Sequence, residues 1–241
     1  MKDPRQLEPL HPANEGGGGV IRHRKVPILL ASRSPRRRQL LDQWGFEHIA
    51  LSPGFEDGML TPGEVTPAQW VASLAYLKAW AGAMLPEAKS DGGHLVVGAD
   101  TTCVLDGKML GTPMSAEEAE AMIRAFAERI DLPQGASTTQ HAGRLHEVLT
   151  GVAIVDLRCV ENESATPHTR TVFVDSARVR MGTLTDQQIS EYIASGEWKG
   201  KAGGYNLAER IAAGWPITFE GDQTTIMGLP MERLSKVLRE M

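Results

Sequence analysis

Val26-Pro-Ile-Leu-Leu-Ala-Ser-Arg-Ser-Pro-Arg-Arg-Arg38 is the stretch in which a short apolar strand passes directly into a helix. The run over 26–31 is brief and apolar, as a buried strand requires. Ser34 suits the residue that precedes a helix, and Pro35 suits its first position because proline needs no amide hydrogen bond there. A strand joined to a helix in this way favours an α/β fold.

Strand and helix patterns alternate irregularly along the rest of the chain. The sequence predicts a helix from Pro35 to a stop at Gly45, a helix from Thr66 to about Met84, a strand over 95–105, a hairpin turn at Asp106-Gly107 with its return at Met109-Leu110, a helix after Ser115, strands over 148–157 and 171–181, a helix from Thr185 to Gly196, and a last helix from about Pro230. We therefore expect an α/β fold with a mixed central sheet and flanking helices.

Two segments lack such patterns. Residues 1–25 are polar and contain four consecutive glycines, so they are predicted to form a disordered arm before a folded domain over 26–241. Residues 131–145 are rich in Gly, Ser, Thr and Gln and are predicted to form a long mobile loop.

The composition argues against two classes of protein. With 25 Lys and Arg against 30 Asp and Glu, the net charge is −5, whereas a general nucleic-acid binder needs a positive field. No apolar run approaches the roughly 20 residues that span a bilayer, and the N-terminus lacks the apolar core of a signal peptide. We expect a cytoplasmic protein that binds neither nucleic acid nor membrane. Cys103 and Cys159 are expected to be buried free thiols.

The helix after Ser34 begins with three arginines, Arg36-Arg-Arg38. A helix N-terminus carries partial positive charge and prefers acidic residues, so this arrangement is unfavourable by itself. A bound phosphate reverses the balance, because amide and guanidinium groups then converge on one anion, with Ser32 and Ser34 as further donors. A solvated basic helix end, or more weakly an RNA-binding run, also fits this motif alone.

Asp100 interrupts the predicted strand in Val96-Val-Gly-Ala-Asp-Thr-Thr102. An unpaired buried carboxylate is costly, so an aspartate in such a place usually pairs, holds a metal or acts as a base. The alternative is an aspartate at the end of the strand that accepts hydrogen bonds from a turn. Thr101 and Thr102 add hydroxyls at the same place, and Gly98 is expected to permit close approach of a ligand.

Three further signals are weaker. Glu56-Asp57 suits Mg²⁺ on a triphosphate, and also suits a solvated loop. Lys78, on the second helix, is most simply a solvated residue. Lys201-Ala-Gly-Gly-Tyr205 places a lysine beside paired glycines, which favours close contact with phosphates, although a plain surface loop fits too. The seven histidines show no spacing of zinc ligands.

In their order along the chain, these segments resemble the Maf family of nucleoside triphosphate pyrophosphatases, once called septum formation inhibitors. The resemblance extends over about 27–241 and rests on six motifs. They are Ile28-Leu-Leu-Ala-Ser-Arg-Ser-Pro-Arg-Arg37, Val97-Gly-Ala-Asp-Thr101, Leu105-Asp-Gly-Lys-Met-Leu-Gly-Thr-Pro113, His146-Glu-Val-Leu-Thr-Gly-Val-Ala153, Lys201-Ala-Gly-Gly-Tyr205, and Gly221-Asp222 followed by Met227-Gly-Leu-Pro230. Each motif is moderately specific, and all of them in the correct order are very specific.

The resemblance implies two lobes around a cleft that holds the nucleotide, in an α/β fold similar to inosine triphosphate pyrophosphatases. It implies hydrolysis of a nucleoside triphosphate to the monophosphate and pyrophosphate, a divalent cation (Mg²⁺ or Mn²⁺) and frequent homodimers. Asp100 matches the catalytic proton acceptor, and Asp57 with Asp100 is the predicted metal site. The predicted substrate-binding residues are Ser32, Ser34, Arg36, Arg37, Lys78, Thr101 and Lys201, of which Arg36 and Thr101 match positions associated with substrate choice.

Two departures from the family pattern bear on activity. Thr112 stands where the family has a phosphate-binding lysine, and Ala208 stands where it has a base-reading glutamine. Arg36 and the Asp100-Thr101 pair resemble the branch that acts on dTTP and UTP, so the hypothesis leans to these or to modified nucleotides, in a house-cleaning role. The alternative is a weakly active nucleotide-binding regulator of cell division or septum formation.

Overall fold

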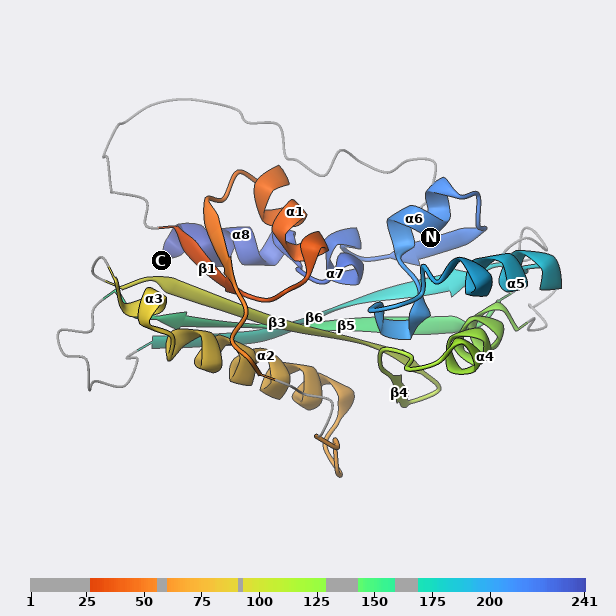
Figure 1. The fold of residues 1–241 in the computed structure, drawn as a ribbon, viewed down its shortest axis with the longest axis horizontal. Coiled ribbons are helices and arrows are strands. Elements are labelled where there is room, and N and C mark those ends of the chain that lie inside the picture. Colours follow the sequence, from red (N-terminus) through yellow and green to blue (C-terminus); the bar gives the residue numbers. More distant parts are fainter. Residues whose placement is uncertain (1–26, 56–59, 91–92, 129–142, 159–168) are drawn as a thin grey trace. The chain divides into compact units, whose positions relative to one another are not determined.

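The computed structural model describes residues 27–55, 60–90, 93–128, 143–158 and 169–241. Helices and strands alternate along these residues (Figure 1). Their bounds are β1 Ile28–Ala31, α1 Pro35–Gln43, β2 His48–Leu51, α2 Pro67–Ala83, α3 Pro86–Lys89, β3 Leu95–Leu105, β4 Lys108–Leu110, α4 Ala116–Ala127, β5 Leu145–Asp156, β6 Thr169–Met181, α5 Asp186–Ser195, η4 (a 3₁₀ turn) Ala202–Gly204, α6 Leu207–Ala212, β7 Ile217–Glu220, α7 Gln223–Met227 and α8 Met231–Glu240.

The described strands form a mixed sheet in the order β2-β1-β3-β5-β6-β7, with β4 paired to β3. β1 runs parallel to β2 and to β3, where Leu29 lies opposite Val96. The pairs β3–β4 and β6–β7 are antiparallel. The predicted α/β class with a mixed sheet is therefore confirmed.

The described chain divides into two compact units, each with its own apolar core. The amino-terminal unit takes the described residues of 27–100, 151–174 and 231–241, and the central unit takes those of 101–150 and 175–230. Within the amino-terminal unit, α2 lies on one side of the strands, and α1 and α8 lie on the other (Figure 1).

Helix α2 packs directly on the strands of the amino-terminal unit because two strand glycines remove side chains from the contact. A Cβ at Gly98 on β3 would lie 2.4 Å from both the Ala75 carbonyl oxygen and the Ala79 amide nitrogen. A Cβ at Gly151 on β5 would lie 2.4 Å from the Val71 carbonyl oxygen. The expectation that Gly98 admits a ligand is therefore wrong, since the backbone of α2 occupies that space.

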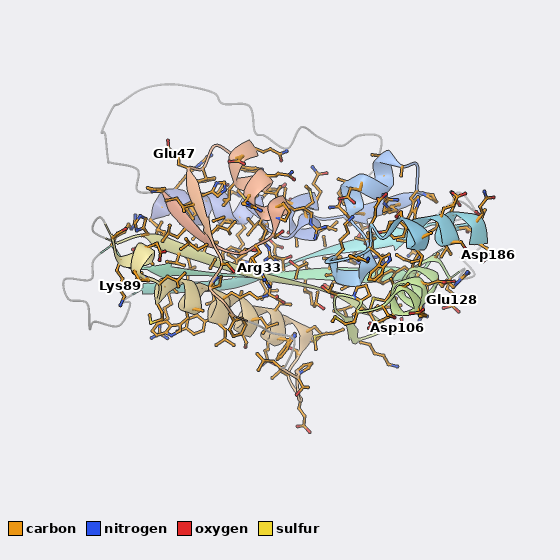
Figure 2. The ribbon with its side chains drawn as sticks, in the orientation of Figure 1. Arg33, Glu47, Lys89, Asp106, Glu128 and Asp186 are labelled. Carbon is orange, nitrogen blue, oxygen red and sulfur yellow. The ribbon has the colours of Figure 1, made fainter. Side chains whose placement is uncertain are left out.

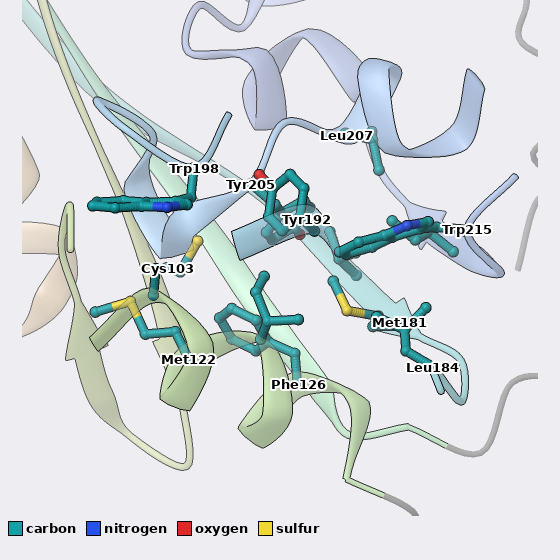
Figure 3. Packing of buried hydrophobic residues seen from close by; sticks show 14 of the residues in the cluster. Cys103, Met122, Phe126, Met181, Leu184, Tyr192, Trp198, Tyr205, Leu207 and Trp215 are labelled. Atoms are coloured by element: carbon teal, nitrogen blue, oxygen red, sulfur yellow. The ribbon is translucent and has the colours of Figure 1, made fainter. Parts of the chain in front are cut away.

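The core of the central unit contains large aromatic side chains, several of them shown in Figure 3. Phe126 stacks on His146 with ring centroids 4.0 Å apart, and its ring meets Tyr205 edge-on at 5.9 Å. Tyr192 on α5 meets Trp215 at 4.9 Å. Aromatic pairs contribute about 1 kcal/mol each beyond the area that they bury, so they fix the segments around Tyr205 and Trp215 against α4 and α5.

Ion pairs on the surface of the central unit join neighbouring elements. Arg144 pairs with Asp106 and with Glu128, and Arg124 on α4 lies 2.6 Å from Asp186 on α5; Figure 2 labels the three acids of these pairs. Exposed pairs of this kind contribute little to stability, so the fold depends mainly on the buried cores.

Local sequence signals locate most of the elements. Helix α2 begins with a full capping box of Thr66 and Gln69, and β3 has the predicted bounds Leu95–Leu105. The hairpin turn is confirmed, with φ of 49° at Asp106 and 77° at Gly107. The sequence patterns do not indicate β2, α3, α6, β7 or α7.

Some predictions fall outside the described residues. These are the arm over 1–25, most of the loop over 131–145, the pair Glu56-Asp57, and Cys159. Among the helices that the structure describes, none combines the length and the apolarity needed to cross a membrane.

Candidate active site

Asp100 lies in a small polar cluster of the amino-terminal unit. Its Oδ1 is 2.6 Å from the ammonium nitrogen of Lys78. Both side chains are mostly buried, with 12% of Asp100 and 18% of Lys78 exposed. The interpretation of Asp100 as a residue at the end of a strand is wrong, because β3 continues to Leu105. The interpretation of Lys78 as a solvated residue is also wrong, because its ammonium group is mostly buried and pairs with Asp100.

The close packing of α2 on β3 places these two side chains together. Residues 98 and 100 face the same side of the strand, because successive side chains alternate. Gly98 lies against the amide of Ala79, and Lys78 is the preceding residue of the helix. A longer residue at position 98 would lift α2 away from β3, and the Lys78 ammonium would then move away from Asp100.

Arg37 links the turn after β1 to strand β3 by hydrogen bonds. Its Nη1 donates to the carbonyl oxygen of Ala99 at 2.8 Å and to the Ser32 hydroxyl at 3.1 Å. The Ser32 hydroxyl also accepts a hydrogen bond from the Ser34 amide at 3.2 Å. The structure therefore brings Ser32 and Arg37 to the residue next to Asp100, and it gives Arg37 a contact to the strand backbone that the sequence does not indicate.

Ser34 and Arg36 lie at the start of α1. Ser34 is the N-cap residue as predicted, but its side chain makes no capping hydrogen bond, and the first turn contains no acidic residue. Arg36 is half-buried within that turn. An anion is the group that such a helix end favours, so both residues stay predicted phosphate ligands.

Thr101 belongs to a chain of hydrogen bonds in the central unit. Its hydroxyl oxygen lies 2.9 Å from that of Thr150, and the Thr150 hydroxyl donates to the carbonyl oxygen of Thr225 at 2.7 Å. A hydroxyl has one proton, so Thr101 is the donor in the bond to Thr150. The sequence reasoning missed Thr150, which the topology brings to Thr101 from β5.

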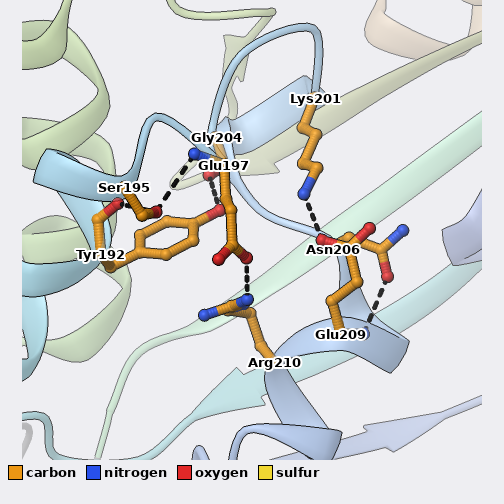
Figure 4. Close-up of polar contacts among 8 residues, drawn as sticks. All are labelled: Tyr192, Ser195, Glu197, Lys201, Gly204, Asn206, Glu209 and Arg210. Atoms are coloured by element: carbon orange, nitrogen blue, oxygen red, sulfur yellow. Dashed lines mark hydrogen bonds and ion pairs between the residues drawn. The ribbon is translucent and has the colours of Figure 1, made fainter.

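Lys201 is mostly buried, with 12% of its side chain exposed, and it pairs with Glu209 in the first turn of α6 (Figure 4). The interpretation of 201–205 as a plain surface loop is wrong, because Gly203, Gly204 and Tyr205 are buried. The sequence reasoning missed Glu209, although Asn206-Leu-Ala-Glu209 has the spacing of a capped helix start.

Three buried ionisable groups of the central unit are poor candidates for chemistry. Burial raises the pKa of the Cys103 thiol to about 12, and burial lowers the pKa of His146 to about 3. Burial also raises the pKa of Tyr205 well above its ordinary value of 10.0, and its hydroxyl lies 2.7 Å from His146 Nε2. All three are uncharged near neutral pH. The prediction that Cys103 is a buried free thiol is confirmed.

The described residues contain no group of three or more His, Cys, Asp or Glu side chains that could hold a metal ion. Asp57 lies outside them, and Asp100 offers a single carboxylate. Mg²⁺ on a triphosphate needs only one or two carboxylates, because phosphates and waters supply its other ligands. The donor set therefore fits a cation that binds together with the nucleotide.

The fold and this cluster define a class of protein. An α/β sheet presents a mostly buried carboxylate, a group that can accept a proton, in contact with an ammonium group. A hydroxyl and a guanidinium group, which can donate to an anion, lie at the neighbouring residue. Such a set is typical of a hydrolase that acts on a phosphorylated substrate.

Comparison with known proteins makes the assignment specific. The sequence model of the family described as Maf-like protein matches residues 27–241. Proteins named dTTP/UTP pyrophosphatase from Pelotomaculum thermopropionicum, Salinibacter ruber and Aromatoleum aromaticum are 38%, 36% and 36% identical to this chain. The matches cover 88% of this chain and 95%, 90% and 93% of the respective relatives. The chain belongs to the Maf family, whose pyrophosphatases generally need a divalent metal.

Proposed function

We propose that this chain is a nucleoside triphosphate pyrophosphatase that converts dTTP and UTP to their monophosphates and pyrophosphate. The Lys78–Asp100 pair carries the proposal, because it places an oriented carboxylate in a mostly buried position on the strand. The relatives named dTTP/UTP pyrophosphatase support the choice of reaction and of nucleotides.

In the proposed reaction, Asp100 accepts a proton from a water molecule. The water oxygen forms a bond to the α-phosphorus, the bond from that phosphorus to the bridging oxygen breaks, and pyrophosphate leaves. Lys78 holds one carboxylate oxygen, so the carboxylate keeps a fixed orientation toward the water. Arg37 and Ser32 brace the adjacent backbone at Ala99.

The substrate contacts in this proposal are donors to phosphate oxygens. Ser34 and Arg36 bind at the start of α1, where amide groups add to the positive field. Arg37 and Lys78 combine their contacts within the protein with phosphate binding, since guanidinium and ammonium groups have several donors. The Ser32 hydroxyl accepts hydrogen bonds from Arg37 and from the Ser34 amide, so its own proton can be donated to phosphate. Lys201 binds phosphate in the central unit, and Thr101 contributes to the choice of nucleotide.

A divalent cation, Mg²⁺ or Mn²⁺, is proposed to bind Asp100 and Asp57 together with the triphosphate. It supplies charge neutralisation on the phosphates. We further propose that the protein forms a homodimer, lies in the cytoplasm and removes modified pyrimidine nucleotides. With Ala208 in place of the family glutamine, other groups of the chain must read the base.

The test is pyrophosphate release by the full chain from a panel of the standard deoxynucleoside triphosphates, UTP and 5-substituted pyrimidine triphosphates, with Mg²⁺ and with Mn²⁺. We expect dTTP and UTP to have the highest kcat/KM. The Asp100→Asn variant should lose about 10³-fold in kcat, because a positioned general base contributes that much.

Two outcomes would contradict the proposal. Full activity of Asp100→Asn would exclude Asp100 as the proton acceptor. Tight nucleotide binding by the wild-type chain without turnover of any substrate in the panel would favour the regulatory alternative, which the replacement of the family lysine by Thr112 makes worth testing.

A further inference from the structure

The backbone of segment 200–205 is fixed by contacts inside the central unit. The Gly203 amide donates to the Gly111 carbonyl oxygen at 2.9 Å, and the Tyr192 hydroxyl donates to the Gly204 carbonyl oxygen at 2.7 Å (Figure 4). Gly203 has a φ of 67°, and a Cβ there would lie 2.6 Å from the sulfur of Cys103, so the position requires glycine. The backbone that carries the neighbouring lysine is therefore held in one conformation.

Helix α6, which carries Glu209, is fixed by a separate set of contacts. The Asn206 side-chain oxygen accepts a hydrogen bond of 3.1 Å from the Glu209 amide and so caps the helix. One turn in, the Arg210 guanidinium lies 4.5 Å from the centre of the Tyr192 ring and pairs with Glu197 (Figure 4). The carboxylate of Glu209 therefore starts from a fixed backbone as well.

Between these two fixed segments, only side-chain rotation decides where the Lys201 ammonium lies. Lysine has a long flexible chain, and its ammonium has three donors, so one ion pair can orient it and leave donors for phosphate. The lysine is 12% exposed and the carboxylate 44% exposed. Water therefore screens repulsion between the carboxylate and a phosphate more than it screens the attraction of the ammonium.

We propose that Glu209 is a positioning residue, which holds the Lys201 ammonium in the orientation in which it binds the phosphates of the nucleotide. This inference rests on the proposed function, which makes Lys201 a phosphate ligand. It assigns a role in the reaction to a residue that would not touch the reacting atoms.

The test compares Glu209→Gln, Lys201→Met and the double variant with the wild-type chain. The readouts are KM and kcat for UTP and, independently of turnover, the Kd of inorganic pyrophosphate by calorimetry. We expect Glu209→Gln to raise KM and Kd about tenfold with little change in kcat, because a charge-assisted hydrogen bond is worth at least that factor. In the Lys201→Met background, Glu209→Gln should have no further effect.

Glu128→Gln is the control. It breaks another ion pair of the central unit, in which the base Arg144 is 29% exposed and the acid Glu128 is 60% exposed, and neither partner lies on α6 or in segment 200–205. We expect a lower Tm and an unchanged KM and Kd. An equal rise in both glutamate variants would show that Glu209 acts only through stability, and would overturn the proposal.

Other results would overturn it too. A fall in KM and Kd for Glu209→Gln would mean that the carboxylate competes with phosphate for Lys201. A rise that persists in the Lys201→Met background would mean that Glu209 does not act through the lysine. Pyrophosphate binding that weakens as expected, in a chain that turns over no nucleotide, would instead sustain the positioning role and reject the enzymatic function.

Discussion

Two lysine–carboxylate pairs of the described chain differ in what holds them. Lys78 lies on helix α2 and Asp100 on strand β3, and the helix backbone packs directly on the strand at Gly98. Both side chains are mostly buried. Lys201 comes from a glycine-rich turn and Glu209 from a six-residue helix, and the acid is 44% exposed. The first pair depends on the close approach of α2 to β3, whereas in the second pair the half-exposed side chain of Glu209 has more room to rotate.

This difference indicates which kind of work each pair suits. Proton transfer needs a carboxylate that stays within hydrogen-bond reach of one water, so a pair fixed by tertiary packing is the better place for it. Binding a triphosphate needs an ammonium that meets an incoming anion, so a pair with one solvated partner is sufficient. Two changes test the contrast, and a third tests a buried group in the unit that holds the second pair; the largest expected effect comes first.

Gly98→Ala should break the first pair and leave the second intact. The added Cβ would lie 2.4 Å from two backbone atoms of α2, so the helix must shift, at a cost of about 3 kcal/mol in the free energy of unfolding. Urea unfolding measures the loss, and pyrophosphate release should fall with it. Gly111→Ala is the control, because a Cβ there meets nothing within 4 Å. Equal stability of the two variants would contradict the packing argument.

Lys78→Met should cost less, about 2 kcal/mol in the free energy of unfolding. Removing one partner of a buried pair leaves a buried charge, and the remaining exposure of Asp100 reduces that penalty. Adding Asp100→Asn to this variant should restore stability, since the uncompensated charge disappears. Thermal unfolding of the single and double variants measures both steps. A double variant less stable than Lys78→Met would show that the ion pair is not the source of the loss.

The smallest effect concerns His146, beside Tyr205 in the central unit. Burial lowers its folded-state pKa to about 3 from an ordinary value of 6.5, so between these values the unfolded chain binds the additional proton. Stability is therefore fully present above pH 6.5 and decreases as the pH falls, by on the order of 1 kcal/mol between pH 7 and 5.5.

Urea unfolding of the wild type and of His146→Gln at the two pH values measures this contribution. Glutamine does not titrate, so the variant should be less stable at pH 7 but should lose less stability on acidification. The same pH dependence in both proteins would exclude His146 as its source. The Lys78–Asp100 pair, in the other unit, should be unaffected by this substitution.

Elements with strong local signals could be predicted from the sequence. Helix α2 has a capping box, and the β3–β4 hairpin has Asp-Gly at its turn. Strand β2 could not, because it is only four residues long, its residues are half-buried or exposed, and its existence depends on pairing with β1. Helix α6 is short, although its Asn-to-Glu cap spacing was a usable signal.

The candidate site divides in the same way. Asp100 could be singled out because a carboxylate in an apolar strand is unfavourable without a partner. Its partner, Lys78, could not be assigned by residue chemistry alone, because the pairing depends on how closely α2 approaches Gly98. Glu209 escaped notice because the partner of Lys201 lies on a helix that the apolar pattern does not reveal. In both cases the pairing itself could not be predicted, because it depends on the tertiary structure.

The two strand glycines under α2 have a consequence for protein engineering. Because Gly98 and Gly151 have no side chains, α2 comes close enough to the strands for the Lys78 ammonium to reach the Asp100 carboxylate. Copying only the charged residues into another α/β scaffold would therefore not reproduce the pair. A graft would have to carry both glycines and the bare helix backbone opposite them. A mutational library that randomised those two positions would be expected to return glycine alone, although neither residue has a functional group to select.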